Sequence, residues 1–76
     1  AYTTLQNYKE AMQAYNLSIS LNEDDEFNYL RRARLNNLLG KFDKAIKDAT
    51  AALTIDPECG QAFYYRAFAN AALGLN

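Results

Sequence analysis

The 76-residue chain matches itself when its sequence is shifted by 34 residues. Seven of the aligned positions are then identical. Five of them hold an apolar residue or glycine, and two hold a polar residue, arginine or asparagine. The identical pairs are Leu5 with Leu39, Ala11 with Ala45, Arg32 with Arg66, Ala33 with Ala67, Asn36 with Asn70, Leu39 with Leu73 and Gly40 with Gly74. Helix–turn–helix units of this length stack because a single unit cannot bury its apolar face alone. The self-match therefore predicts a solenoid of stacked helix pairs.

The amino-acid composition also favours helices. Thirteen residues are alanine and ten are leucine, whereas valine is absent and isoleucine occurs three times. Branching at Cβ restricts a side chain in a helix, so this balance disfavours strands. Apolar residues at helical spacing predict four helices near residues 7–21, 27–39, 43–55 and 61–73. The predicted fold class is all-α, with helices that pack antiparallel because the connections between them are short.

Signals for helix ends separate the predicted helices. Gly40 and Gly74 are expected to end helices, because glycine readily adopts the left-handed conformation found there. Asp56 and Pro57 are expected to stop the third helix, since proline disfavours helical geometry in the residue before it. The acidic run at residues 22–26 lies where the second helix begins, and negative charge is favourable at a helix N-terminus. We expect this run to form a capping turn rather than an acidic ligand or metal loop.

The residue inventory argues against an enzyme. The chain has no histidine, which excludes a Ser–His or Cys–His nucleophile. Cys59 is the single cysteine, so neither an intrachain disulfide nor a Cys/His zinc site can form. The three glycines are isolated and make no phosphate-binding loop. We therefore predict no catalytic residue, no metal site and no cofactor.

The charge balance argues against nucleic acid and membrane partners. Eight lysines and arginines face nine aspartates and glutamates, so no overall basic field attracts polyanions. No apolar run approaches the ~20 residues that a membrane span needs, and the first residues lack the features of a signal peptide. A free thiol without disulfides fits a reducing compartment, so the sequence favours a cytoplasmic location.

Two segments and several spaced positions follow a known pattern. Residues 40–46 have the sequence Gly-Lys-Phe-Asp-Lys-Ala-Ile, and residues 52–57 have the sequence Ala-Leu-Thr-Ile-Asp-Pro. Upstream, Tyr29 lies where the pattern has an aromatic residue, and Ala33 lies where it has a small residue. With these residues the chain resembles the tetratricopeptide repeat family over essentially its whole length, which implies a right-handed solenoid of helical hairpins. It departs from the family pattern at Arg32, Asn36, Arg66, Asn70, Ala49 and Glu23.

The phase of the resemblance divides the chain into one complete and two incomplete repeats. Residues 1–25 would be the end of one repeat, with residues 1–5 as the tail of a first helix and Asn7 to Leu21 as the second helix. Residues 26–59 would be one complete repeat, and residues 60–76 would hold the first helix of the next. Because each terminal helix then lacks its partner, we expect either a fragment of a longer protein or completion by another molecule.

The resemblance implies that the first helix of each repeat lines a concave groove that binds partner peptides. Independently, Arg31 and Arg34 are three residues apart and share a helix face. Two guanidinium groups beside aromatic rings suit a protein or peptide partner with a carboxylate and an apolar anchor. The candidate peptide-binding residues are Arg31, Arg34, Asn37, Tyr64, Tyr65 and Phe68.

Structural alternatives compete with this interpretation. Tyr64 or Phe68 would instead be core residues or contacts to a further repeat. Arg31 would instead pair with Glu26 or Asp48 on the surface. The repeated arginines, Arg32 and Arg66, are expected to be structural, with stems packed between helices and head groups extending to water.

Residues 29–33 resemble the co-chaperone branch of the family, which binds a C-terminal carboxylate of heat-shock chaperones. That branch uses lysine, asparagine and arginine from three first helices. If residues 26–59 match the middle repeat of that branch, the asparagine position holds Arg31, and the following lysine and arginine positions hold Gln61 and Tyr65. If they match its last repeat, Arg31 takes the arginine position but Phe27 replaces the lysine. The clamp is therefore mostly absent from this chain, and chaperone-tail binding is a minority hypothesis.

Two further functions are compatible with the sequence. The unpaired terminal helices could stack between molecules, head to tail or by helix exchange, and form a homo-oligomer. The self-association candidates are Met12, Tyr15 and Ile19 against Ala67, Ala71 and Leu73. Alternatively, the chain is a targeting appendage of an enzyme that lies outside these residues.

Overall fold

The computed structural model describes residues 5–74, with side chains described from residue 7 onward. This part of the chain is helical except for short turns, so the predicted all-α fold is confirmed. Each described helix end lies within about two residues of the predicted one. The helices are α1 (Leu5–Leu21), α2 (Glu26–Leu38), α3 (Phe42–Ile55) and α4 (Gly60–Leu73).

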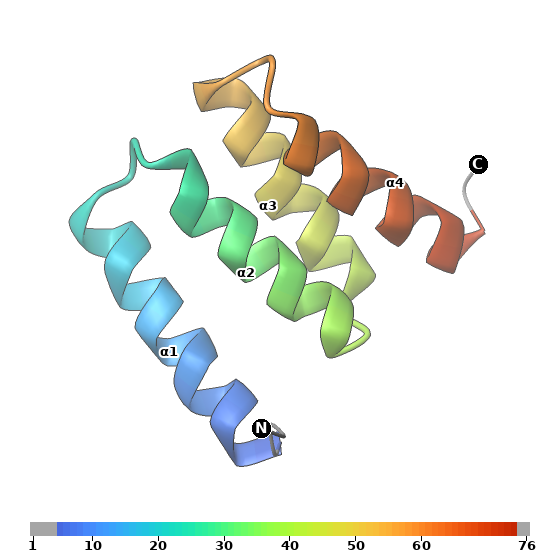
Figure 1. Ribbon diagram of the computed structural model, residues 1–76. Helices are drawn as coiled ribbons and strands as arrows, with labels where there is room; N and C mark the ends of the chain where they lie inside the picture. The colour runs from blue at the N-terminus through green and yellow to red at the C-terminus, as the bar shows by residue number, and fades with distance from the viewer. Residues whose placement is uncertain (1–4, 75–76) are drawn as a thin grey trace.

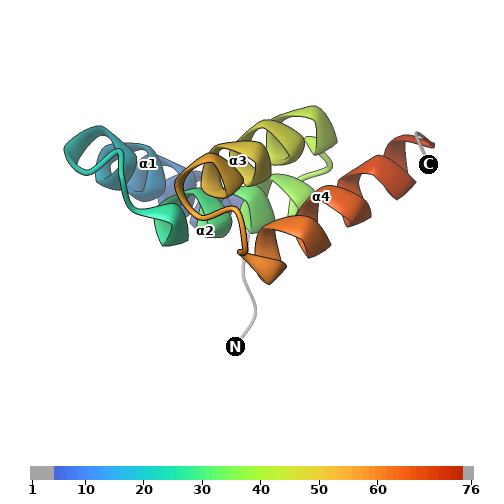
Figure 2. The ribbon, with the colours of Figure 1, turned by 90° about the horizontal axis from the view of Figure 1, so that it is seen from above.

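Consecutive helices run antiparallel and form two layers. Figure 1 shows the chain turning back at each short connection, and Figure 2 shows α1 and α3 in one layer with α2 and α4 in the other. Helix α2 packs against the other three helices, whereas α1 packs on α2 alone among the helices of residues 5–74. The arrangement is an all-α helical-hairpin repeat, and α2 lies at its centre.

The start of α1 differs from the prediction. The helix runs without a break from Leu5 to Leu21, so Leu5 is not the tail of a preceding helix. The remainder of that predicted tail, residues 1–4, lies outside the described residues. The self-match placed Leu5 opposite Leu39 at a helix end, but no glycine follows Leu5 to end a helix there.

The acidic turn before α2 has the predicted capping role. Asp25 occupies the N-cap position with extended backbone geometry, and its carboxylate accepts a hydrogen bond from the Phe27 N–H at 3.0 Å. This bond satisfies one of the backbone donors that a helix start leaves unpaired. Glu26 adds a negative charge in the first turn, where the helix dipole favours it.

The end of α2 depends on glycine. Gly40 has a φ angle of 77°, which other residues rarely adopt. With this geometry the Gly40 N–H donates to the Asn37 carbonyl and the Lys41 N–H donates to the Asn36 carbonyl. These two bonds form a Schellman motif, which turns the chain sharply into α3.

Alanine allows the helices to approach closely. Ala33, Ala45, Ala49, Ala52, Ala62 and Ala69 are completely buried. No larger side chain among the described residues reaches that degree of burial. Leu30 joins three of these alanines in a core that links α2, α3 and α4, with Tyr29 and Leu53 packed against it. The high alanine content therefore serves helix packing as well as helix propensity.

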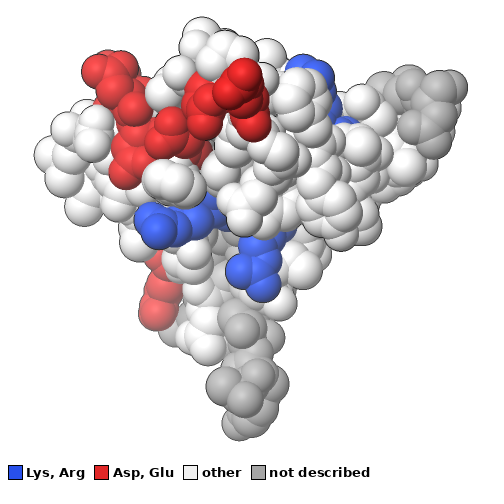
Figure 3. Space-filling model, turned by 45° about the horizontal axis from the view of Figure 1, so that its top comes forward, with Lys and Arg blue, Asp and Glu red and all other residues white. Residues whose placement is uncertain are grey.

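Acidic residues gather at one end of the molecule. The α1–α2 and α3–α4 turns lie at the same end of the molecule, and both are acidic (Figures 1 and 3). The acidic residues of these turns are Glu23, Asp24, Asp25, Glu26, Asp56 and Glu58. Lys41 and Lys44 lie at the opposite end, where α2 passes into α3.

Candidate functional site

The predicted peptide-binding residues line one continuous surface between α2 and α4. A hollow of about 300 Å³ has Arg31 and Arg34 in its wall, and a neighbouring hollow of about 190 Å³ contains Asn37. The two hollows share Arg34 and Tyr65. We call this surface the α2–α4 groove; it contains Arg31, Arg34 and Asn37 of α2 and Tyr64, Tyr65 and Phe68 of α4. The structure therefore brings all six residues together.

The aromatic rings of the groove face solvent. Tyr64 is 65% exposed and Phe68 is 50% exposed, so neither ring belongs to the core. The Tyr64 and Tyr65 ring centres lie 5.6 Å apart. The Phe68 ring packs against the Phe42 ring of α3, with ring centres 6.3 Å apart. Such tilted pairs fix the ring positions while leaving apolar surface available.

Asn37 connects the two helices of the groove. Its amide nitrogen donates a hydrogen bond to the Tyr65 carbonyl at 3.2 Å. Its amide oxygen is buried and has no hydrogen-bond partner. A buried acceptor without a partner is unfavourable, so a donor supplied at this position would be stabilising.

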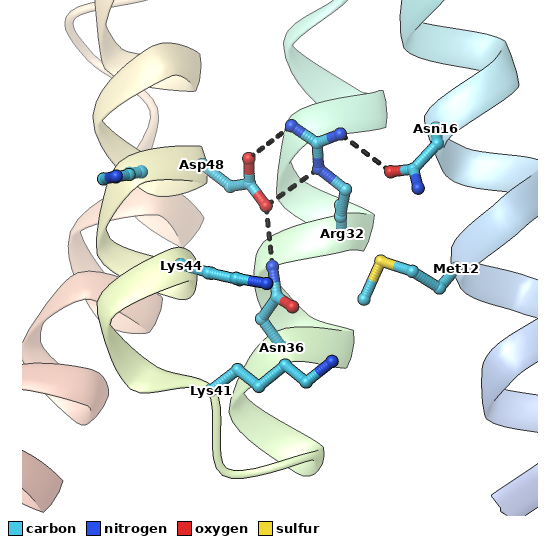
Figure 4. A pocket seen from close by; sticks show the side chains of 8 residues that line it. Met12, Asn16, Arg32, Asn36, Lys41, Lys44 and Asp48 are labelled. Atoms are coloured by element: carbon cyan, nitrogen blue, oxygen red, sulfur yellow. Dashed lines mark hydrogen bonds and ion pairs between the residues drawn. The ribbon is translucent and has the colours of Figure 1, made fainter.

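A polar network holds α1, α2 and α3 together on the other side of α2 (Figure 4). Arg32 binds both carboxylate oxygens of Asp48, with Nε donating at 2.9 Å and Nη2 at 2.7 Å. Its remaining nitrogen, Nη1, donates to Asn16 of α1 at 2.8 Å. Asn36, one turn along α2, also donates to Asp48 at 2.9 Å. We call these four residues the Arg32–Asp48 network.

This network corrects two sequence-based expectations. Asp48 was a possible surface partner of Arg31. However, Asp48 is only 5% exposed, and its carboxylate is bound by Arg32. Arg32 does pack between helices as expected, yet its head group is bound to Asp48 and Asn16 instead of extending to water. Arg32 and Asn36 share a face because they are four residues apart, and that spacing was the available signal.

Helix α4 repeats the residue pattern of one face of α2, but this face is not packed against a helix of the described chain. The Arg66 guanidinium lies 5.3 Å from the Phe63 ring centre, just as Arg32 lies 5.9 Å from the ring centre of Tyr29. Ala33 of α2 is fully buried, but Ala67, its equivalent on α4, is exposed. The face of α4 thus has the α2 pattern but no helix of the described chain upon it.

The self-association candidates are divided between surface and interior. Ala67, Ala71 and Leu73 are exposed on α4, as expected. Met12 and Tyr15 are only half-buried on α1. Ile19, however, is 8% exposed and belongs to the core, so the expectation of an exposed Ile19 is wrong. The large exposed side chains of α1 are instead Leu17 and Leu21.

Three other features bear on function: the free cysteine, possible metal ligands and the apolar length of the helices. Cys59 is a free thiol at the N-cap position of α4, half-buried against the core. Among residues 5–74, no three histidine, cysteine or acidic side chains gather closely enough to hold a metal ion. No helix in this part of the chain is both long and apolar enough to cross a membrane.

Comparisons with known proteins agree with the repeat pattern. The family model described as tetratricopeptide repeat matches residues 1–25 and 28–59. A protein of Mycosarcoma maydis, named small glutamine-rich tetratricopeptide repeat-containing protein 2, is 37% identical over 57 residues. That alignment covers 75% of this chain but 16% of the relative, so the chain spans about one sixth of its length. No solved structure shows significant similarity.

Proposed function

Because this chain belongs to the tetratricopeptide repeat family, whose repeats generally mediate protein–protein interactions, we propose that its α2–α4 groove binds a peptide segment of a partner protein. The partner segment carries a carboxylate and an apolar or aromatic side chain. In this proposal the chain is an interaction module and performs no catalysis itself.

One observation carries this proposal: two guanidinium groups and three aromatic rings line adjoining hollows. Arg31 and Arg34 are both exposed, and arginine binds carboxylates through two parallel hydrogen bonds. The exposed rings of Tyr64 and Phe68 offer contact area for an apolar side chain. The unpartnered amide oxygen of Asn37 could accept a backbone N–H of the bound peptide.

The test uses a fluorescein-labelled peptide with one phenylalanine and two aspartates among alanines. Replacing Arg31 and Arg34 with glutamine is expected to weaken its binding on the order of 10-fold to 100-fold, since central arginine contacts dominate many interfaces. Fluorescence anisotropy gives the affinity, and far-UV circular dichroism checks that helicity is unchanged.

The control is a second double variant with the same change in charge, Lys44→Gln with Lys47→Gln, which lies outside the groove. It should leave the affinity for this peptide within about twofold. Equal affinities of the wild-type chain and the Arg31/Arg34 variant would remove the groove from the account.

Self-association is a second candidate function, favoured by the exposed apolar side chains of both terminal helices. Leu73 of α4 is 43% exposed, and Leu21 of α1 is more exposed still. If these faces stack between molecules, sedimentation equilibrium over a hundredfold concentration range should show species heavier than 8.6 kDa. A charge at Leu73, introduced as Leu73→Glu, should then restore the monomer. A monomer at every concentration of the wild-type chain would reject this candidate.

A further inference from the structure

A second hollow lies on the opposite face of α2 from the α2–α4 groove. It measures about 380 Å³ and opens between α1 and α3, which do not contact each other. Arg32 and Asn36 form its floor, and an α-helix turns about 100° per residue, so they point away from Arg31 and Arg34. We call it the lysine pocket, because Lys41, Lys44 and Lys47 line it.

The pocket has an unbalanced positive charge. Its one carboxylate, Asp48, is already bound by Arg32 in the network described above. The three lysines are exposed, Lys41 at the N-cap position of α3 and the other two on α3, and Figure 4 shows Lys41 and Lys44 extending towards Asn36. Met12 approaches from α1 on the other side and adds an apolar wall. An anionic ligand would therefore find charge complementarity without displacing an existing ion pair.

The spacing of the lysines indicates what kind of anion fits. Lys41, Lys44 and Lys47 spread over about 9 Å of helix, because a helix rises about 1.5 Å per residue. A row of this length can contact two carboxylates of an extended chain, which recur about every 7 Å when alternate residues are acidic. A single compact anion such as phosphate would contact only part of this row.

The floor of the pocket offers a second criterion. The Asn36 side chain is nearly fully buried, and its amide oxygen has no hydrogen-bond partner. That oxygen requires a donor. A peptide carries an N–H donor at nearly every residue, whereas hydrogen phosphate carries a single O–H donor.

We propose that the lysine pocket binds an acidic peptide segment, with its carboxylates on Lys41, Lys44 and Lys47 and its backbone directed towards Asn36. This site is separate from the α2–α4 groove, so the module could hold two partner segments on its two faces. Its test is independent of the groove, because the two sites share no side chain.

The probe is a fluorescein-labelled peptide of alternating glutamate and alanine, which lacks the aromatic anchor that the groove requires. Replacing Lys44 and Lys47 with glutamine is expected to weaken its binding by about tenfold or more. The matched control is the Arg31→Gln, Arg34→Gln variant, which removes the same charge from the other face and should bind within about twofold of wild type. Amide shifts in the nuclear magnetic resonance spectrum should centre on Met12, Asn16 and residues 41–47.

Three results would overturn the proposal. The first is an equal loss of affinity in both double variants, which would indicate a response to net charge alone. The second is a set of amide shifts centred on α4. The third is displacement of the peptide by inorganic phosphate more strongly than by sodium chloride of equal ionic strength, which would assign the pocket to a compact anion. A peptide with glutamine in place of glutamate should not bind.

Discussion

Replacing Asp48 with alanine is expected to lower the free energy of unfolding by about 3 kcal/mol, because it leaves partly buried polar groups without a partner. Asp48 accepts three hydrogen bonds, two from Arg32 and one from Asn36. Without it, the Arg32 side chain, 25% exposed, can turn only partly towards water. A chain of this size has a total stability of only about 4–11 kcal/mol, so the loss would be large. Urea unfolding followed by far-UV circular dichroism measures it.

Asp43→Ala is the matched control for this prediction. Asp43 lies on the same helix and is exposed in its first turn, where its loss should cost less than about 1 kcal/mol through the helix dipole. A double variant, Arg32→Leu with Asp48→Leu, should recover only part of the lost stability, because an apolar pair replaces the ion pair at little cost but the buried Asn36 amide still lacks its acceptor. If Asp48→Ala costs no more than Asp43→Ala, the network does not stabilise the fold.

Replacing Ala49 with leucine is expected to destabilise the chain by about 2 kcal/mol through overpacking. Ala49 is fully buried in the core that joins α2, α3 and α4, and helices separated by alanine have no space for three more carbon atoms. The helices would have to move apart, which also strains the bond between Asn37 and the Tyr65 carbonyl across the groove. Chemical denaturation measures the loss of stability.

Ala14→Leu provides the control, because Ala14 is exposed in the middle of α1 and leucine is nearly as good a helix former as alanine. Its stability should change by less than about 0.5 kcal/mol. Similar values for the two variants would mean that close packing at Ala49 is unimportant. The peptide affinity of Ala49→Leu should also fall, since the position of α4 relative to α2 shapes the groove.

Local signals in the sequence predicted most of the fold. These signals lie within a few residues of the helix ends that they determine: Gly40 after α2, Pro57 after α3, and the acidic turn with the N-cap residue Asp25 before α2. The gathering of the groove residues was predicted too, because the family resemblance places the first helix of each repeat along a groove and helical spacing puts Arg31 and Arg34 on one face. Leu38, which also lines the groove, was missed because it lies next to the helix end.

Contacts between distant residues could not be predicted in the same way. The partner of Arg32 is 16 residues away, and its choice over Arg31 depends on how α2 is rotated against α3. Ile19 is buried because α2 covers that side of α1, whereas Leu17 and Leu21 face outward. The lysine pocket was missed for a similar reason. Its three lysines recur every third residue, but the pocket exists only because α1 and α3 stand apart.

The acidic turns at one end of the molecule give binding a direction. An anionic peptide that approaches from that end meets repulsion from both turns, while Lys41 and Lys44 lie at the α2–α3 end. Within about 10 Å at moderate salt, this field would guide the acidic part of a peptide away from the turns. A partner segment with charge at only one terminus would then lie in the groove in a single polarity, and added salt would let the reverse orientation compete.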